Sequence, residues 1–183
     1  MKKNSDENLA NKKIIAFIGL MGVGKTTVGS KLAARLGYYF IDSDQEIEDR
    51  EKKTIAEIFA ENGEKYFREV EKKTIQEIVL RDESIVLSLG GGAFIDDDVR
   101  KILKEKAVTI WLNADIDDIL FRVAGKKNRP LLNQNNRRET LQNLFAKRKP
   151  IYSEADLQFN TSNESHESLI RKLLKIVSVK NEK

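Results

Sequence analysis

Short apolar runs alternate with stretches of helical periodicity along most of the chain. The apolar runs are too short for helices, and most are rich in β-branched or aromatic residues, which indicates buried strands. Because strand and helix patterns alternate, we expect an α/β fold with a parallel sheet, right-handed crossovers and helices on both faces. The predicted strands are Ile14–Ile18, Tyr38–Ile41, Ile85–Leu89, Val108–Leu112 and Leu157–Phe159.

The segments between these runs carry apolar residues at helical spacing. Gly37, Asn62-Gly63 and Pro150 are expected to end helices. The stretch from Gly125 to Asn136 is basic, rich in Asn and without periodicity, so we expect a mobile loop there. The predicted helices cover about residues 28–36, 45–50, 55–62, 66–79, 96–106, 115–123, 138–149 and 165–179.

The 183 residues fit one domain with a sizeable core, expected over residues 13–180. Residues 1–12 are polar and lack the apolar core of a secretory signal, so we expect a flexible extension. No apolar run approaches the roughly 20 residues of a membrane span. Cysteine is absent, which excludes disulfides and fits a cytoplasmic location. The single histidine, His166, lies in a polar stretch, where an exposed or capping role is expected.

The charge pattern does not favour a nucleic-acid partner. The chain has 33 basic and 29 acidic side chains, a net charge of +4, with both signs interleaved along the predicted helices. A nucleic-acid-binding protein usually shows a basic block with aromatic partners, whereas the aromatic residues here fall at core spacing. We therefore expect small-molecule partners, no nucleic-acid or membrane partner, and a monomer.

The first predicted strand leads directly into a glycine-rich motif. The segment Gly19–Thr26 matches the phosphate-binding pattern GxxxxGK[ST] at every fixed position, and a helix pattern follows it. Glycines let backbone N–H groups converge on phosphate oxygens, and the helix N-terminus adds positive potential. Lys25 would reach the β- and γ-phosphates of a nucleotide, and Thr26 would ligate Mg²⁺. A chance match is disfavoured by the strand–loop–helix context.

Two more distinctive segments follow predicted strands. Asp42-Ser43-Asp44 ends the second strand and Gly90–Gly92 follows the third. Ligands of parallel sheets bind at the carboxyl ends of the strands, so both belong beside the phosphate loop. If the extended backbone continues, one aspartate faces the metal and the other a second substrate, although a plain turn is the alternative. Three glycines suggest a ligand against bare backbone. Ser88 could contact a metal-bound water, but a hydroxyl bonded to backbone is the simpler interpretation.

Three arginines could serve an anionic ligand, and the local pattern leaves structural explanations open. Arg68 has acidic neighbours at i−4 and i+3, Glu64 and Glu71, which fits a surface ion-pair ladder. Arg148 lies near a predicted helix end, where a cation complements the dipole. Arg129, in the predicted mobile loop, could cover the phosphates and exclude water.

Six motifs in their order along the chain resemble the shikimate kinase family. The phosphate loop is common to many families, whereas the ordered set is specific, and the likeness extends from Lys13 to the last helix. The motifs are Gly19–Thr26, Asp42-Ser43-Asp44, Phe67-Arg68-x-x-Glu71, Ser88–Gly92, Arg129-Pro130-Leu131-Leu132 and Lys147-Arg148-x-Pro150-x-Tyr152.

The resemblance implies a three-layer α-β-α P-loop fold with a five-stranded parallel sheet of order 2-3-1-4-5 and a mobile lid at about residues 125–136. It implies ATP-dependent phosphorylation of the 3-hydroxyl of shikimate, a step of aromatic amino acid biosynthesis. Asp44 would bind the shikimate hydroxyls, and Arg68 and Arg148 would clamp its carboxylate. The implied substrate-binding set is Asp44, Phe59, Phe67, Arg68, Gly90, Gly91, Gly92 and Arg148.

The resemblance also implies roles at the nucleotide. Asp42 with Thr26 would hold the cofactor Mg²⁺, Arg122 would lie near the adenine, and Arg129 would be the lid arginine. The stretch after Thr161 would contact adenine, although it lacks the basic and proline residues of some members. The implied catalytic residues are Lys25, Asp44 and Arg129. The implied ATP-binding set is Gly22, Val23, Gly24, Lys25, Thr26, Thr27, Arg122 and Arg129.

Two alternatives stay open at this stage. Another small-molecule kinase of the same fold, such as a gluconate kinase, would share the phosphate loop but does not need two arginines for a carboxylate beside three glycines. A nucleotide-binding module without catalysis would be expected to have lost Lys25, Asp44 or Arg129, and all three are present.

Overall fold

The structure of the protein is a computed structural model that describes residues 12–124, 136–162 and 164–178. The expected extension at residues 1–12, apart from its last residue, and the expected lid with Arg129 lie outside the described residues. The strands are β1 (Ile14–Ile18), β2 (Tyr39–Asp42), β3 (Ile85–Ser88), β4 (Ala107–Asn113) and β5 (Leu157–Asn160). The helices are α2 (Lys25–Leu36), α3 (Ser43–Glu51), α4 (Ile55–Val79), the 3₁₀ turn η1 (Ala93–Ile95), α5 (Asp97–Lys106), α6 (Ile116–Val123), α7 (Arg137–Tyr152) and α8 (His166–Ser178).

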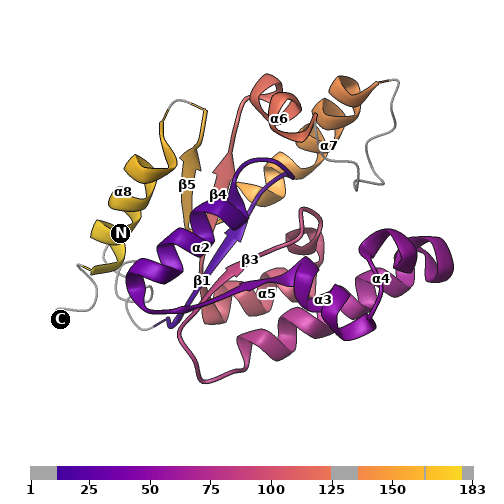
Figure 1. The fold of residues 1–183 in the computed structure, drawn as a ribbon, viewed down its shortest axis with the longest axis horizontal. Helices are drawn as coiled ribbons and strands as arrows, with labels where there is room; N and C mark the ends of the chain where they lie inside the picture. The colour runs from indigo at the N-terminus through magenta and orange to yellow at the C-terminus, as the bar shows by residue number, and fades with distance from the viewer. Residues whose placement is uncertain (1–11, 125–135, 163, 179–183) are drawn as a thin grey trace.

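The five strands form one parallel sheet in the order β2-β3-β1-β4-β5, as predicted. The chain moves from β1 to β2 in one direction along the sheet and from β2 through β3 and β4 to β5 in the other. Right-handed crossovers therefore place α2 on one face and α4, α5 and α7 on the opposite face. Accordingly α2 contacts α8, and α4 contacts α5; Figure 1 shows helices flanking the strands on both sides.

The central strand is buried along its whole length because helices cover both faces of the sheet. All five residues of β1 are buried, and Phe17 and Val86 pack toward Gly29 of α2. The glycine lets α2 approach the sheet closely, since a Cβ there would lie 2.9 Å from the Phe40 ring. A separate small cluster of Ile47, Ile58 and Phe67 joins α3 to α4. This second cluster supports α3 and α4 beside the carboxyl edge of the sheet.

Two local expectations were wrong. The second strand was expected to be buried, but β2 is an edge strand, and its Tyr39 is 65% exposed. The seventh helix was expected to end at Pro150, yet α7 continues to Tyr152. A proline near a helix end removes one N–H bond, and the last turn is still closed by the Ser153 N–H donating to Lys149 O at 2.9 Å.

The break after residue 62 was predicted correctly. Gly63 has φ 81° and ψ 173°, which is not helical, so α4 consists of two helical pieces that meet at a kink. The first piece begins with a capping box in which Thr54 and Glu57 bond reciprocally. Within the described residues, no helix is both long and apolar enough to cross a membrane.

Candidate active site

The phosphate loop joins β1 to α2 and depends on glycine for its shape. Gly19, Gly22 and Gly24 have φ values of 134°, 80° and 101°, which other residues rarely adopt. A Cβ at Gly19 would also lie 2.2 Å from the backbone oxygen of Leu112. The Lys25 side chain is 8% exposed, and its Nζ donates to the carbonyl oxygens of Gly19 and Leu20 at 3.0 Å each. The loop thus presents a buried cation beside converging backbone amides.

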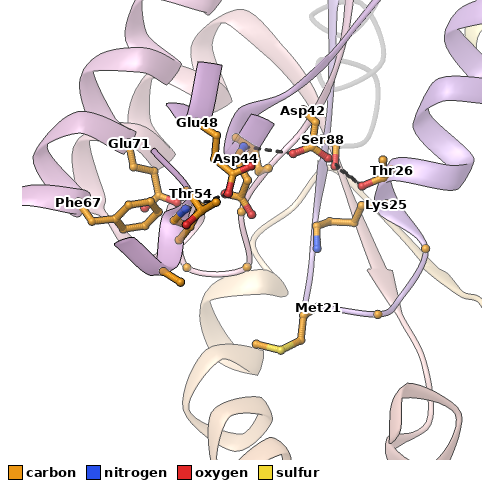
Figure 2. Close-up of a pocket in the computed structure, with 18 of the residues that line it drawn as sticks. Met21, Lys25, Thr26, Asp42, Asp44, Glu48, Thr54, Phe67, Glu71 and Ser88 are labelled. Atoms are coloured by element: carbon orange, nitrogen blue, oxygen red, sulfur yellow. Dashed lines mark hydrogen bonds between the residues drawn. The ribbon is translucent and has the colours of Figure 1, made fainter. Parts of the chain in front are cut away.

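Three side-chain oxygens that could ligate a metal lie close together beside this loop. The Thr26 hydroxyl donates to Asp42 Oδ2 at 2.8 Å and lies 3.4 Å from Ser88 Oγ (Figure 2). No group of three or more His, Cys, Asp or Glu side chains that could hold a metal occurs among the described residues. Mg²⁺ is typically bound through one or two side chains together with substrate phosphates. The hard oxygen donors of Thr26 and Asp42 fit that mode of binding.

The two aspartates separate for a reason that differs from the predicted one. The extended backbone does not continue past Asp42; this residue caps α3, and its Oδ1 accepts from the Asp44 N–H at 3.1 Å. Asp44 therefore lies in the first helical turn and faces the Gly90–Gly92 loop, which follows β3. The hydroxyl of Ser43, between the two aspartates, accepts a hydrogen bond from the Gly90 N–H at 2.9 Å. The helix start, rather than strand alternation, directs Asp42 and Asp44 to different places.

Charged side chains gather against the Gly90–Gly92 loop. A Cβ at Gly90 would lie 2.5 Å from Asp44 Oδ1 and 2.7 Å from Glu71 Oε1, and one at Gly92 would lie 2.6 Å from Arg68 Nη1. A Cβ at Gly91 would be in ordinary contact with Arg148 Nη1, at 3.5 Å. None of these glycines has a positive φ, so Gly90 and Gly92 are favoured by lack of space rather than by backbone conformation.

Arg68 is oriented by two carboxylates from its own helix. Its Nη1 donates to Glu71 Oε2 at 2.6 Å and its Nη2 pairs with Glu64 Oε1 at 3.2 Å. The guanidinium carbon lies 5.1 Å from the Phe67 ring centroid, and the Phe67 ring lies 4.7 Å from that of Phe59. The predicted ion-pair ladder therefore exists, but it lines the cavity and lies against Gly92 instead of facing only solvent.

Glu71 is 3% exposed, and its second oxygen, Oε1, has no hydrogen-bond partner within the described part of the chain. Burial raises the pKa of Glu71, although Arg68 acts in the opposite direction. Burial alone would lower the pKa of Arg68, but Glu71 and Glu64 outweigh it and raise that pKa, so Arg68 stays cationic. The carboxyl group of Glu71 and the guanidinium group of Arg68 thus line the same cavity. Figure 2 shows the Glu71 side chain near Asp44 and Thr54.

Arg148 and Tyr152 hold the glycine loop from α7. Arg148 Nη1 donates to Gly91 O at 2.9 Å, and the Tyr152 hydroxyl donates to the same oxygen. Tyr152 is buried, its ring lies 5.8 Å from that of Trp111, and burial raises its pKa, so it remains a donor. The motif that contains Arg148, Pro150 and Tyr152 therefore joins α7 to the loop after β3.

The other end of the cavity lies between the phosphate loop and α8. Arg122 donates to Thr161 O at 3.0 Å and to Thr161 Oγ1 at 3.1 Å. His166 begins α8, and its Nε2 would lie 3.1 Å from a Cβ at Gly24. Burial, Arg122 and Lys31 lower the pKa of His166 from its ordinary value of 6.5. His166 lines the cavity, which the polar surroundings in the sequence did not indicate.

These groups share one cavity of about 530 Å³. All the described site residues that were predicted line it except Val23, whose side chain is 1% exposed in the core. Residues that the sequence analysis did not propose as ligand contacts also line it. They are Met21, Glu48, Thr54, Ile55, Ala56, Glu71, Leu89 and His166. Of these, Met21, Glu71 and Leu89 lie within motifs noted in the sequence, whereas the others belong to none of those motifs.

Comparisons with known proteins agree with this geometry. The family model described as shikimate kinase matches residues 21–178. Shikimate kinase from Cereibacter sphaeroides is 46% identical over 158 residues, 86% of this chain and 79% of that protein. The structure of shikimate kinase from Acinetobacter baumannii in complex with shikimate has a TM-score of 0.88 and 35% identity, and covers 97% of this chain and 99% of its own.

A gluconokinase from Sinorhizobium meliloti is less similar. Its TM-score is 0.56 at 15% identity, with 90% of this chain and 91% of that chain covered, which is a likeness of fold alone. The family match covers nearly all of the described chain, and residues from the five motifs that the structure describes line one cavity. This protein belongs to the shikimate kinase family.

Proposed function

We propose that this protein transfers the γ-phosphoryl group of ATP to the 3-hydroxyl of shikimate, giving shikimate 3-phosphate and ADP. The observation that carries the proposal is the shared cavity, in which a backbone anion cradle faces a separate pair of guanidinium groups. The cradle is Gly19–Thr26, and the pair is Arg68 and Arg148. A kinase that uses ATP needs the anion cradle for the phosphates, and an acceptor with a carboxylate needs the guanidinium pair.

Arg68 and Arg148 are the proposed clamp for the shikimate carboxylate. Guanidinium groups suit this task because they offer planar pairs of donors that match a carboxylate. Glu64 and Glu71 hold Arg68 in place before substrate arrives, which reduces the entropy lost on binding. The rings of Phe59 and Phe67 supply an apolar wall for the ring carbons of the acceptor.

Asp44 is the proposed partner of the attacking hydroxyl. It lies against Gly90 and lines the same cavity as the arginine pair and the phosphate loop, and we propose that it orients a hydroxyl toward the γ-phosphate. Glu71 Oε1, buried and without a protein partner among the described residues, adds a second acceptor for a ring hydroxyl. A positioned hydroxyl gains rate chiefly through orientation.

Lys25 and the loop amides are the proposed stabilisers of charge on the transferred phosphoryl group. Phosphoryl transfer depends mainly on positioning and electrostatic stabilisation. Thr27 and Arg122 also line the cavity, and we propose them as contacts of the nucleotide. We propose Thr26 and Asp42 as the residues that would hold Mg²⁺, which supplies charge neutralisation of the phosphates when bound. The role of Arg129, the monomeric state, the cytoplasmic location and the single-domain organisation over residues 13–180 stay predictions.

A coupled ADP-release assay with shikimate, gluconate and nucleoside monophosphates tests the proposal. We expect turnover with shikimate alone, because the paired rings of Phe59 and Phe67 beside the arginine pair suit a cyclic carboxylate, whereas gluconate is an open-chain carboxylate and the nucleoside monophosphates carry no carboxylate. Asp44→Asn is a second test: it should abolish transfer while leaving ATP binding intact, since the Asp44 carboxylate lies against Gly90 and is not part of the phosphate loop. Turnover with gluconate and none with shikimate would favour the other kinase of this fold. ATP binding without transfer to any acceptor would favour a non-catalytic module.

A further inference from the structure

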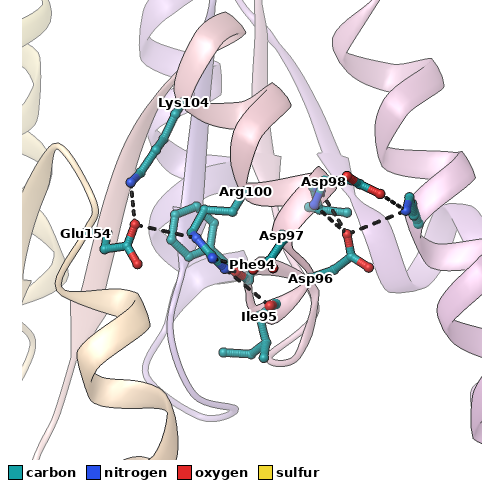
Figure 3. Close-up of polar contacts among 10 residues, drawn as sticks. Phe94, Ile95, Asp96, Asp97, Asp98, Arg100, Lys104 and Glu154 are labelled. Carbon is teal, nitrogen blue, oxygen red and sulfur yellow. Dashed lines mark hydrogen bonds and ion pairs between the residues drawn. The ribbon is translucent and has the colours of Figure 1, made fainter.

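Arg100 lies on α5, on the far side of the glycine loop from the cavity, and makes contacts with each of its three nitrogens. Its side chain is 17% exposed. Nη1 donates to the carbonyl oxygens of Phe94 and Ile95, at 3.2 Å each, and Nη2 donates to Asp97. Nε lies 3.5 Å from Glu154 Oε2 (Figure 3). The guanidinium thus joins the end of η1 to the segment that follows α7.

The carbonyls that Arg100 holds belong to the same short turn as the acceptor loop. The Ala93 N–H donates to Gly90 O at 3.1 Å, and the Ile95 N–H donates to Gly92 O at 3.1 Å. Residues 90–95 therefore form a continuous hydrogen-bonded unit. Its first half faces the charged side chains of the cavity, and its second half is bound by Arg100. A shift of one half moves the other, because these two bonds link them.

Glu154 closes a ring of contacts around this unit. It follows Tyr152 by two residues and pairs with Arg100 and Lys104 (Figure 3). On the cavity side, Arg148 and Tyr152 bond to Gly91 O. The end of α7 is therefore attached to the same turn twice, at Gly91 directly and at its far end through Arg100. This double attachment constrains the distance between Arg148 and the glycine backbone.

We propose that Arg100 is a positioning residue for the acceptor half of the site. It acts through the turn at residues 90–95 and through Glu154. In this way it fixes the position of Arg148 relative to the Gly90–Gly92 backbone, where a carboxylate-bearing substrate would bind. Arg100 does not line the cavity. No described hydrogen bond joins the phosphate loop to this ring of contacts, although a Cβ at Gly91 would lie 3.6 Å from Gly19 O and Met21 N. The effect should therefore fall mainly on the acceptor. The inference rests on the proposed function.

Arg100→Met tests the proposal because it keeps the aliphatic stem and removes the donors. We expect the KM and the calorimetric Kd for shikimate to rise on the order of ten-fold, since a small misplacement of binding groups is costly. The KM for ATP should stay within about two-fold of wild type. Arg100→Lys keeps the charge opposite Glu154 but cannot bond two carbonyls and two carboxylates at once, so it should restore only part of the affinity.

Lys104→Met is the matched control. It removes the other cation that pairs with Glu154 and leaves the bonds to Phe94 and Ile95 intact, so shikimate kinetics should be unchanged. A double-mutant cycle of Arg100→Met with Tyr152→Phe adds a second readout. Since both side chains restrain one turn, their effects on shikimate binding should be non-additive.

Three results would overturn the positioning role and leave Arg100 as a stabilising residue only. They are equal changes in the KM values for shikimate and ATP, unchanged shikimate binding in Arg100→Met, and additive effects in the double-mutant cycle. If Arg100→Met does not fold, the two KM values are compared in Arg100→Lys and Glu154→Gln instead. In these variants we expect a smaller rise in the shikimate KM and no rise in the ATP KM. Failure of the wild type to phosphorylate shikimate would instead refute the proposed function, so the two failures are distinguishable.

Discussion

Two glycine-rich loops meet at the cavity, and they use glycine for different reasons. In the loop at Gly19–Gly24, three glycines adopt positive φ, so the backbone itself makes the binding surface. In the loop at Gly90–Gly92, the backbone conformation is ordinary, and a Cβ at Gly90 or Gly92 would clash with charged groups from other elements. We expect the first loop to bind phosphate through its own amides, whereas the second is a backbone surface against which side chains from other elements pack.

The difference has consequences for tolerance to change. A Cβ at Gly19 would meet the backbone oxygen of Leu112, which cannot move without shifting β4. A Cβ at Gly92 would meet the tip of Arg68, a long side chain that can rotate away. Damage to the first loop should therefore affect the nucleotide and often the fold. Damage to the second should redirect a binding group while the protein remains folded.

The largest effect is expected from Lys25→Ala, which removes the only side-chain cation of the phosphate loop. Turnover should fall on the order of 10²–10³-fold, because charge stabilisation in the transition state is lost. Steady-state kinetics with saturating shikimate measure this. Lys31→Ala, an exposed lysine on the same helix, serves as control. Turnover close to wild type in Lys25→Ala would contradict the role given to the loop.

A comparison of Gly24→Ala with Gly92→Ala separates the two loops. Gly24→Ala places a Cβ at φ 101° and close to His166, at a conformational cost of about 1–2 kcal/mol, and should raise the KM for ATP. Gly92→Ala displaces Arg68 and should raise the KM for shikimate about ten-fold with the ATP KM nearly unchanged. If both substitutions raised the same KM, the division of the cavity into two halves would be wrong.

The smallest effect concerns His166. Its folded-state pKa is lowered from 6.5, so the unfolded chain binds the proton more readily, and stability is lost as pH falls through the folded-state pKa. His166→Gln should therefore lose less unfolding free energy than wild type between about pH 7.5 and pH 5.5. Urea unfolding at the two pH values measures this. An equal loss in both proteins would show that His166 is not held neutral.

Prediction and structure agree where the information is local, or where the family resemblance supplied the long-range order. The sheet order implied by the family resemblance, the break at Gly63 and the strand–loop–helix context of the phosphate motif are all present in the structure. The predictions were wrong where contacts with other parts of the fold decide where a helix ends or whether a strand is buried. Pro150 did not end its helix, and β2 is an edge strand although its sequence is apolar.

The acceptor half shows the same limit. Arg68, Arg148 and the three glycines were identified through the resemblance, but the local pattern of Arg68 was equally consistent with a surface ion pair. The structure shows the ion pair of Arg68 with Glu71, and it shows that Arg68 also lies against Gly92 in the cavity, while its role toward substrate stays a prediction. His166 was expected to be exposed or capping, and only the approach of α8 to Gly24 revealed it as part of the cavity.

The sequence by itself determined the backbone-built half of the site. Its function resides in a continuous run of residues whose conformational freedom and charge are properties of the residues themselves. Only the tertiary structure decided which side chains pack against the Gly90–Gly92 backbone in the cavity and which residues hold this loop from outside the cavity. Asp44, Arg68, Glu71, Arg148 and Arg100 come from four helices, α3, α4, α5 and α7. Their chemistry arises from packing distances that no local pattern contains.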